Sequence, residues 1–270
     1  MRVILAAVGT VALVSSAMAA DLPVKASSPL PAAPVQTWTG FYAGGDVGGL
    51  WTRNGSGVWS PLDVIHYGVF PNVGTLQDNS VVGGVHAGYN WQFAPTWVAG
   101  IEADWSWTDA KSSFSQPWVR SDTGAVRPNT LATMSLSEDW IATVRGRIGY
   151  LVTPATLVYF TGGVAWSKFD YTGNSHNELI TSATQLPFVA QSQFSATKPG
   201  YVLGGGLEYA FWGNWSVRAE YLYYHFNTAA AASPVSDSTG NFPQPVFFSG
   251  FHWNGDTKIN VVRAGVSYKF

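Results

Sequence analysis

The chain ends in Asn260-Val261-Val262-Arg263-Ala264-Gly265-Val266-Ser267-Tyr268-Lys269-Phe270, where apolar and polar residues alternate. Counted back from Phe270, one face carries apolar side chains, and the other carries Lys269, Ser267 and Arg263. Successive side chains of a β-strand point to opposite faces, so the pattern predicts a strand with one apolar and one charged face. Such a strand fits between lipid and the polar interior of a transmembrane barrel. A strand of a soluble sandwich also alternates, and the rest of the chain must decide between the two.

The composition favours the membrane alternative. Charged residues make up 11% of the chain, against roughly 25% in ordinary soluble domains. Aromatic residues reach 15%, with 13 Trp, and there are 29 Gly. The net charge of −2 offers no basic surface for nucleic acid, so we expect no nucleic-acid partner. The chain has no cysteine, which excludes disulfides and thiolate metal sites.

The amino terminus predicts a secretory signal peptide over residues 1–19. Arg2 precedes an apolar run, and Ala17-Met18-Ala19 has the A-x-A form of a cleavage site. The alternative, a transmembrane helix, needs a longer apolar run. Residues 20–37 are rich in Pro and Ala and predict an extended periplasmic linker, with a partner-binding tract as the alternative. The barrel is then predicted over residues 38–270.

Eight alternating segments divide the rest of the chain. They are 41–53, 81–93, 97–110, 138–152, 156–171, 200–212, 215–228 and 257–270. Three links are tight turns, at Pro95, Pro154 and Gly213-Asn214, whereas the other four are about 25 residues each. The prediction is therefore an all-β fold, an eight-stranded antiparallel up-and-down transmembrane β-barrel with four long extracellular loops.

Two details of the sequence test this division into strands. A proline breaks a strand ladder, and no proline falls inside a predicted strand, since Pro199 stands just before one begins. In the last strand Ile259 and Val261 fall on the charged face, which predicts a bulge or the bilayer edge near Asn260.

Charged residues on the inward faces form one constellation. Its members are Asp46, Glu102, Asp104, Arg145, Arg147, Glu208, Arg218, Glu220 and Arg263, with Lys269 on the same face. The interior of an eight-stranded barrel is just wide enough for side chains to fill. Isolated buried charges are prohibitively unfavourable, so we expect these residues to pair and to fill the lumen. The alternative is a narrow polar conduit whose selectivity they set.

The sequence offers little for catalysis or for a cofactor. Glu102 and Asp104 lie two apart on one face, but with four arginines opposite they are better explained as ion pairs than as an acid–base dyad. His86 is predicted to point inward beside Asn90, and His66, His176 and His252 are placed in loops without metal-ligand spacing. We therefore expect no enzyme, no cofactor and no metal, and a haem- or metal-binding role for loop histidines is the weaker alternative.

Three segments resemble a known family. Ala20-Asp21-Leu22-Pro23, Trp38-Thr39-Gly40-Phe41-Tyr42-Ala43-Gly44-Gly45 and the carboxy-terminal Val262–Phe270 resemble porin-like outer-membrane β-barrel proteins of Gram-negative bacteria. The barrel is similar to the OmpA/OmpX eight-stranded type. The resemblance implies a location in the cell outer membrane, among outer-membrane lipid and lipopolysaccharide. It also implies insertion by the barrel-assembly machinery, with Phe270 as the assembly signal.

The prediction for function is a structural role in envelope integrity together with surface display. The first alternative is a diffusion porin for small solutes. The second is an outer-membrane receptor for a ligand such as haem, or an outer-membrane enzyme. Fold-level resemblance alone does not choose among them.

Overall fold

The computed structural model describes residues 37–54, 56–61, 76–117, 130–177, 188–232, 236–237 and 248–270. The predicted signal peptide and all of the predicted linker except Thr37 lie outside these residues. The strands are β1 (Gly40–Asn54), β2 (Ser56–Pro61), β3 (Leu76–Ala94), β4 (Trp97–Gln116), β5 (Thr130–Thr153), β6 (Thr156–Asn177), β7 (Phe188–Trp212), β8 (Trp215–Asn227), β9 (Ala230–Ala232), β10 (Ser236–Asp237), β11 (Phe248–Asn254) and β12 (Asp256–Lys269).

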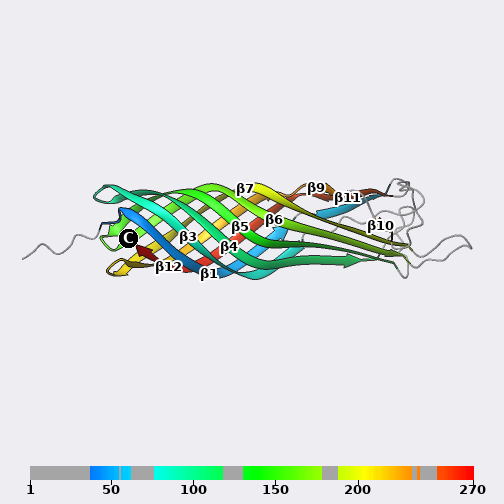
Figure 1. The fold of residues 1–270 in the computed structure, drawn as a ribbon, viewed down its shortest axis with the longest axis horizontal. Coiled ribbons are helices and arrows are strands. Elements are labelled where there is room, and N and C mark those ends of the chain that lie inside the picture. Colours follow the sequence, from blue (N-terminus) through cyan, green and yellow to red (C-terminus); the bar gives the residue numbers. More distant parts are fainter. Residues whose placement is uncertain are drawn as a thin grey trace, which may run out of the picture. The chain divides into compact units, whose positions relative to one another are not determined.

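Among the described residues, eight long strands form a closed antiparallel ring (Figure 1). Each strand pairs with the next along the chain, from β3 to β8, and β12 pairs with both β8 and β1 to close the ring. The register between β1 and β12 runs without interruption from Tyr42 opposite Lys269 to Arg53 opposite Lys258. A closed ladder has no free edge, which is what a strand protein needs in lipid. The predicted eight-stranded barrel is confirmed.

The three tight turns lie where they were predicted, at one end of the barrel. β4 begins at Trp97, β6 at Thr156 and β8 at Trp215. Backbone groups at these turns form hydrogen bonds with neighbouring strands. For example, Leu151 N donates to Thr96 O over 2.8 Å. We call this the turn end and the opposite end the far end.

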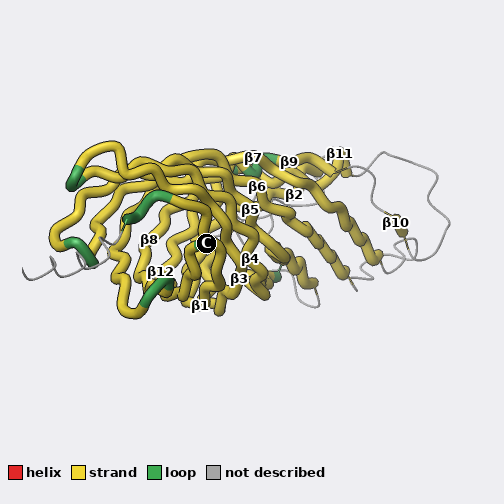
Figure 2. The backbone as a smooth tube through the Cα atoms, turned by 60° about the vertical axis from the view of Figure 1, so that its left-hand side comes forward, coloured by secondary structure: helices red, strands yellow, loops and turns green. Residues whose placement is uncertain are grey.

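Toward the far end the strands are longer than predicted. β5 begins at Thr130 instead of residue 138, β7 begins at Phe188 instead of residue 200, and β6 continues to Asn177. Parts of the predicted long loops are therefore strand, and Figure 1 shows β5, β6 and β7 reaching well beyond the body of the ring. A small separate sheet of β2, β11 and β9 also lies toward this end (Figure 2).

Three sequence predictions at this end need correction. His176 lies in β6 and His252 in β11, so neither is in a loop, while His66 lies outside the described residues. Pro199 lies inside β7, opposite Trp166 of β6. Its missing N–H is tolerated because the ladder between β7 and β8 begins only at Gly200.

The outward face carries two bands of exposed aromatic side chains. Near the turn end they are Trp91, Phe93, Trp97, Tyr150, Phe211, Trp212, Trp215 and Phe270. Nearer the far end they are Trp51, Trp105, Trp107, Trp166, Tyr201 and Tyr221. In β4, Trp97 and Trp107 stand ten positions apart, close to the roughly 9–11 residues of a transmembrane strand. No helix formed by the described residues has the length and apolar character needed to cross a membrane.

The lumen is layered. A charged middle layer lies between an apolar layer at the turn end and a larger apolar layer at the far end. The turn-end layer consists of Trp38, Val98, Leu151, Leu157 and Tyr159. The far-end layer consists of Leu50, Val82, Ala110, Met134, Leu136, Ile141, Ala165, Phe169, Tyr171, Val202, Leu222, Tyr224, Phe226, Ile259 and Val261.

Two alternatives were predicted near Asn260, a bulge or the bilayer edge, and the far-end layer explains why the bulge is wrong. β12 keeps an unbroken register through Asn260 with both β8 and β1. Ile259 and Val261 are 0% and 2% exposed because they pack into the far-end layer from the inward face of β12. Asn260 points outward, and its Oδ1 accepts a hydrogen bond from the Tyr221 hydroxyl over 2.7 Å.

Candidate functional site

The charged middle layer brings together the nine residues that the sequence places on inward faces. They come from β1 (Asp46), β4 (Glu102, Asp104), β5 (Arg145, Arg147), β7 (Glu208), β8 (Arg218, Glu220) and β12 (Arg263), and all are buried. The strand period of two explains the arrangement, since in each strand these residues occupy alternate positions. Lys269, by contrast, is half-buried at the turn end, where its Nζ donates to Thr37 O.

Arg145 lies at the centre of this layer and is 1% exposed. Its Nη1 donates to Glu220 Oε1 over 3.0 Å, and its Nη2 donates to Glu102 Oε1. The same Nη2 lies 3.2 Å from Asp104 Oδ2. One guanidinium therefore joins carboxylates of β4 to a carboxylate of β8 across the lumen.

Arg218 binds a carboxylate with both arms of its guanidinium. Its Nε donates to Asp46 Oδ1 over 2.9 Å and its Nη2 to Asp46 Oδ2 over 2.7 Å. Its Nη1 also donates to Glu102 Oε2 over 2.7 Å. Bidentate pairing of this kind fixes geometry as well as charge.

Arg263 and Arg147 extend the network in opposite directions. Arg263 Nε donates to Glu220 Oε2 over 2.9 Å, and its Nη1 donates to Asp104 Oδ1 over 3.1 Å. Arg147 Nη2 donates to Glu208 Oε2 over 2.7 Å, on the side of the turn end. Every arginine of the set thus pairs with at least one carboxylate.

Two tyrosines that the sequence analysis did not single out contact the charged middle layer, Tyr42 and, from the turn-end layer, Tyr159. The Tyr42 hydroxyl donates to Glu102 Oε2 over 2.7 Å and accepts a hydrogen bond from Arg147 Nη1 over 3.0 Å. The Arg147 guanidinium also lies over the Tyr159 ring, 4.1 Å from its centroid. Parity could have identified both residues, because Tyr42 shares a face with Asp46 and Tyr159 with Thr161.

His86 points inward, as predicted, and joins the same network. Its Nδ1 lies 2.7 Å from Asp46 Oδ2, and its Nε2 lies 2.8 Å from Ser267 Oγ. Both ring nitrogens are therefore engaged. In the part of the chain that the structure describes, no cluster of three His, Asp or Glu residues could hold a metal ion.

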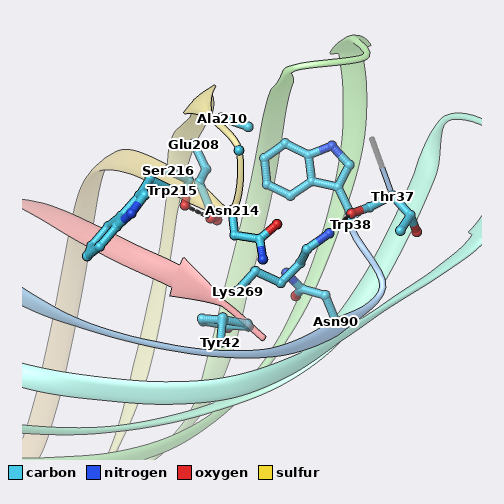
Figure 3. A pocket seen from close by; sticks show the side chains of 11 residues that line it. Thr37, Trp38, Tyr42, Asn90, Glu208, Ala210, Asn214, Trp215, Ser216 and Lys269 are labelled. Atoms are coloured by element: carbon cyan, nitrogen blue, oxygen red, sulfur yellow. Dashed lines mark hydrogen bonds between the residues drawn. The ribbon is translucent and has the colours of Figure 1, made fainter. Parts of the chain in front are cut away.

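Trp38 closes the turn end of the lumen, a role that the sequence analysis missed. Its indole Nε1 donates to Pro154 O over 3.1 Å, its backbone N donates to Gln92 Oε1 over 3.1 Å, and it is 5% exposed. Figure 3 shows Trp38 beside a small cavity that Asn90 and Lys269 also line. The cavity has a volume of about 20 Å³, room for about one water molecule.

Closed strand pairing, a lipid-facing apolar surface and a charged interior define a transmembrane β-barrel of the outer-membrane class. Residues 8–270 match the family model described as outer membrane protein beta-barrel domain, and the chain belongs to this family. Its location is accordingly the cell outer membrane, as the resemblance implied.

Similar proteins are named in the same terms. The chain is 33% identical over 275 residues to a 31 kDa outer-membrane immunogenic protein of Brucella melitensis biotype 1, covering 99% of each chain. It is 27% identical over 198 residues to a 22 kDa outer membrane protein of Rhizobium leguminosarum bv. viciae, covering 73% of this chain and 69% of the relative. Among solved structures, the outer membrane protease OmpT of Escherichia coli aligns with a TM-score of 0.44 and 11% identity, covering 87% of this chain and 98% of that chain.

Proposed function

We propose that this protein is a sealed outer-membrane barrel with a structural role in envelope integrity, and that it displays its far end at the cell surface. In outer-membrane barrels the short turns face the periplasm and the longer connections face outward. The turn end is therefore periplasmic and the far end extracellular. The name of the Brucella relative, an outer-membrane immunogenic protein, fits such display.

The observation that carries this proposal is the layered lumen. The guanidinium groups of the middle layer are held by carboxylates, so they leave no row of free charges to guide an ion. On one side Trp38 covers the lumen, and on the other the rings of Phe169 and Phe226 pack edge to face, with centroids 5.5 Å apart. A filled interior is also what an eight-stranded barrel has room for.

Conductance of the purified full chain in planar bilayers tests the proposal. We expect currents near background in the wild type. A variant that combines Trp38→Ala, Phe169→Ala and Phe226→Ala removes side-chain volume from both apolar layers. This variant should show more frequent and larger current steps than the wild type. Large charge-selective currents in the wild type would contradict a sealed lumen and favour the diffusion porin.

The structural role itself needs a cellular test. A strain that lacks the protein should become more sensitive to detergents and to large antibiotics that an intact outer membrane excludes. The wild-type chain should restore resistance, and so should a sealed variant such as Lys111→Ala. Unchanged sensitivity in the deletion strain would contradict the role in envelope integrity.

For assembly and surroundings we propose the partners that the resemblance implies. The outward aromatic bands would contact outer-membrane lipid and lipopolysaccharide, because aromatic side chains collect at the two interfaces of the bilayer. Phe270 would act as the signal for the barrel-assembly machinery. The guanidinium and carboxylate groups of the charged middle layer are paired with one another, so this layer supports neither the haem receptor nor the enzyme.

A further inference from the structure

Glu138 stands apart from the charged middle layer. It lies on β5, opposite Ala110 of β4 and Phe169 of β6, on the far side of the Trp107–Trp140 pair. That places it beyond the outer aromatic band and therefore beyond the bilayer. The residue is 2% exposed, and neither Oε1 nor Oε2 has a hydrogen-bond partner among the described residues. A buried carboxyl in this state is unfavourable unless something binds it.

The groups around Glu138 supply more acceptors. Asn54 of β1 is also buried, with its Nδ2 donating to Ser112 Oγ over 3.1 Å and its Oδ1 left without a partner. Asp78 of β3 is half-buried, and its Oδ2 accepts a hydrogen bond from the backbone N of Lys111 in β4 over 2.6 Å, while no hydrogen bond within the described residues is given to its Oδ1. These contacts place Asn54 at Ser112 and Asp78 at Lys111, the two β4 positions that follow Ala110, and Ala110 lies opposite Glu138.

The cationic side chains described at this level of the barrel point away from Glu138. Lys111 is turned outward to Asp109, 2.7 Å away, with side chains 67% and 79% exposed. Lys168 is turned outward to Asp139 and Asp170, at 2.9 and 3.0 Å. Arg263 belongs to the middle layer, where it binds Glu220 and Asp104.

We propose that Glu138, Asp78 and Asn54 form a site for a divalent cation of the Ca²⁺ class. The unpartnered atoms are acceptors from carboxylate and amide groups, the hard oxygen ligands that Ca²⁺ prefers. Two carboxylates match a divalent charge, and a carboxylate with two free oxygens can bind in bidentate fashion. Mg²⁺ is less suited, because it retains several waters and the apolar layer around Glu138 leaves them little room.

Such a site has a structural consequence that the sealed lumen does not require. Its ligands lie where the strands leave the bilayer, so a bound cation would join β1, β3 and β5 at the base of the extracellular extension. The cation would stabilise that base and leave the charged middle layer unchanged. This inference stands independently of whether the barrel conducts.

The test uses the full chain refolded in detergent and stripped with EDTA. Tb³⁺, a Ca²⁺ analogue whose luminescence is sensitised by nearby aromatic rings, reports binding directly, and Tyr171 lies close enough for the Glu138 charge to act on it. We expect saturable luminescence that Ca²⁺ displaces, and a Ca²⁺-dependent rise in the denaturant midpoint. Glu138→Gln should weaken binding at least tenfold, whereas Asp139→Asn, next along β5 and outward-facing, should bind like the wild type.

A second variant keeps the test decisive if Glu138→Gln folds poorly. Asp78→Asn changes a half-buried ligand and should also weaken Tb³⁺ binding without abolishing the barrel. Equal binding by wild type, Glu138→Gln and Asp78→Asn would overturn the site. The site would also be overturned if the wild type did not respond to Ca²⁺ or EDTA and Glu138→Gln raised the denaturant midpoint. Glu138 would then be a buried acid that binds only a proton.

Discussion

At the scale of single residues, the use of arginine instead of lysine explains how the buried charges of the lumen are paired. Each cation of the middle layer contacts more than one acceptor, as where Arg218 binds Asp46 with two nitrogens and Glu102 with a third. A lysine offers one compact charge, whereas the planar guanidinium offers five donors in a fixed fork. Arginine can therefore satisfy several carboxylates at once, which a narrow, buried space demands.

Arg145→Ala should destabilise the barrel strongly. The side chain is fully buried among Glu102, Asp104 and Glu220, so its removal leaves carboxylates that are no longer balanced. We expect a loss of about 3–5 kcal/mol in the free energy of unfolding, measured from the denaturant midpoint in detergent. Lys111→Ala is the control, because that exposed pair should contribute nothing measurable. An unchanged midpoint in Arg145→Ala would show that water penetrates the layer and screens it.

At the scale of strands, the sequence predicts correctly those parts of the strands that lie in the bilayer. Between the two aromatic bands each outward position must be apolar, so the alternation is clear and the tight turns stand out. Beyond the far band the alternation inverts. In β5 the inward Met134 and Leu136 are buried apolar residues, whereas Thr133 and Ser135 face outward. The outward face has left the lipid and the core is inside, as in a water-soluble barrel.

The register shifts at this boundary hid the inversion from sequence analysis. The pairing of β4 with β5 shifts register between Trp107 and Ala110, and the pairing of β5 with β6 shifts between Glu138 and Ile141. In β5 the buried positions change at this point from even-numbered residues to odd-numbered ones, so the phase of the pattern changes there. Predicted strands consequently stopped at these bulges, and the rest was assigned to loops. The contacts of Trp38 could not be predicted either, because they join segments more than fifty and more than one hundred positions apart.

Close packing between strands predicts a sharp difference between two adjacent glycines of β1. A Cβ on Gly48 would lie 2.2 Å from Val262 O and 2.6 Å from Arg263 Cα, whereas a Cβ on Gly49 would meet nothing nearer than 3.5 Å. Gly48→Ala must therefore push β12 away, at about 1–3 kcal/mol of stability. Gly49→Ala should be close to neutral. Denaturant midpoints of the two variants check this, and equal values would contradict the tight β1–β12 approach.

The terminal strand allows folding and assembly to be separated. Phe270 is 75% exposed, and its backbone N donates to Phe41 O over 2.9 Å. Removing Phe270 should therefore leave refolding in detergent nearly unchanged, whereas the amount inserted in cells should fall severely if the residue is the assembly signal. The control is Phe211→Ala, an exposed aromatic in the same band that is not at the chain end. Normal insertion of the shortened chain would contradict the assembly role.

At the scale of the whole molecule, different zones of the barrel face different surroundings. Its middle band faces lipid outside and ion pairs inside, while its far end pairs a polar outer surface with an apolar core. These zones can coexist because the ring is closed along its length and every strand crosses more than one of them. The direction in which the barrel is inserted then decides which end meets the environment.

The absence of cysteine makes that direction directly measurable, since a single introduced thiol is the only one in the chain. Ser113 lies outward and exposed on the extension of β4, and Asn214 lies exposed in the β7–β8 turn. In intact cells a membrane-impermeant maleimide should label Ser113→Cys and should reach Asn214→Cys only after the outer membrane is permeabilised. Val144→Cys, on the lipid-facing surface, is the control and should resist the reagent in both conditions because bilayer covers it. Labelling of Asn214→Cys in intact cells with protection of Ser113→Cys would reverse the orientation and remove the basis for surface display.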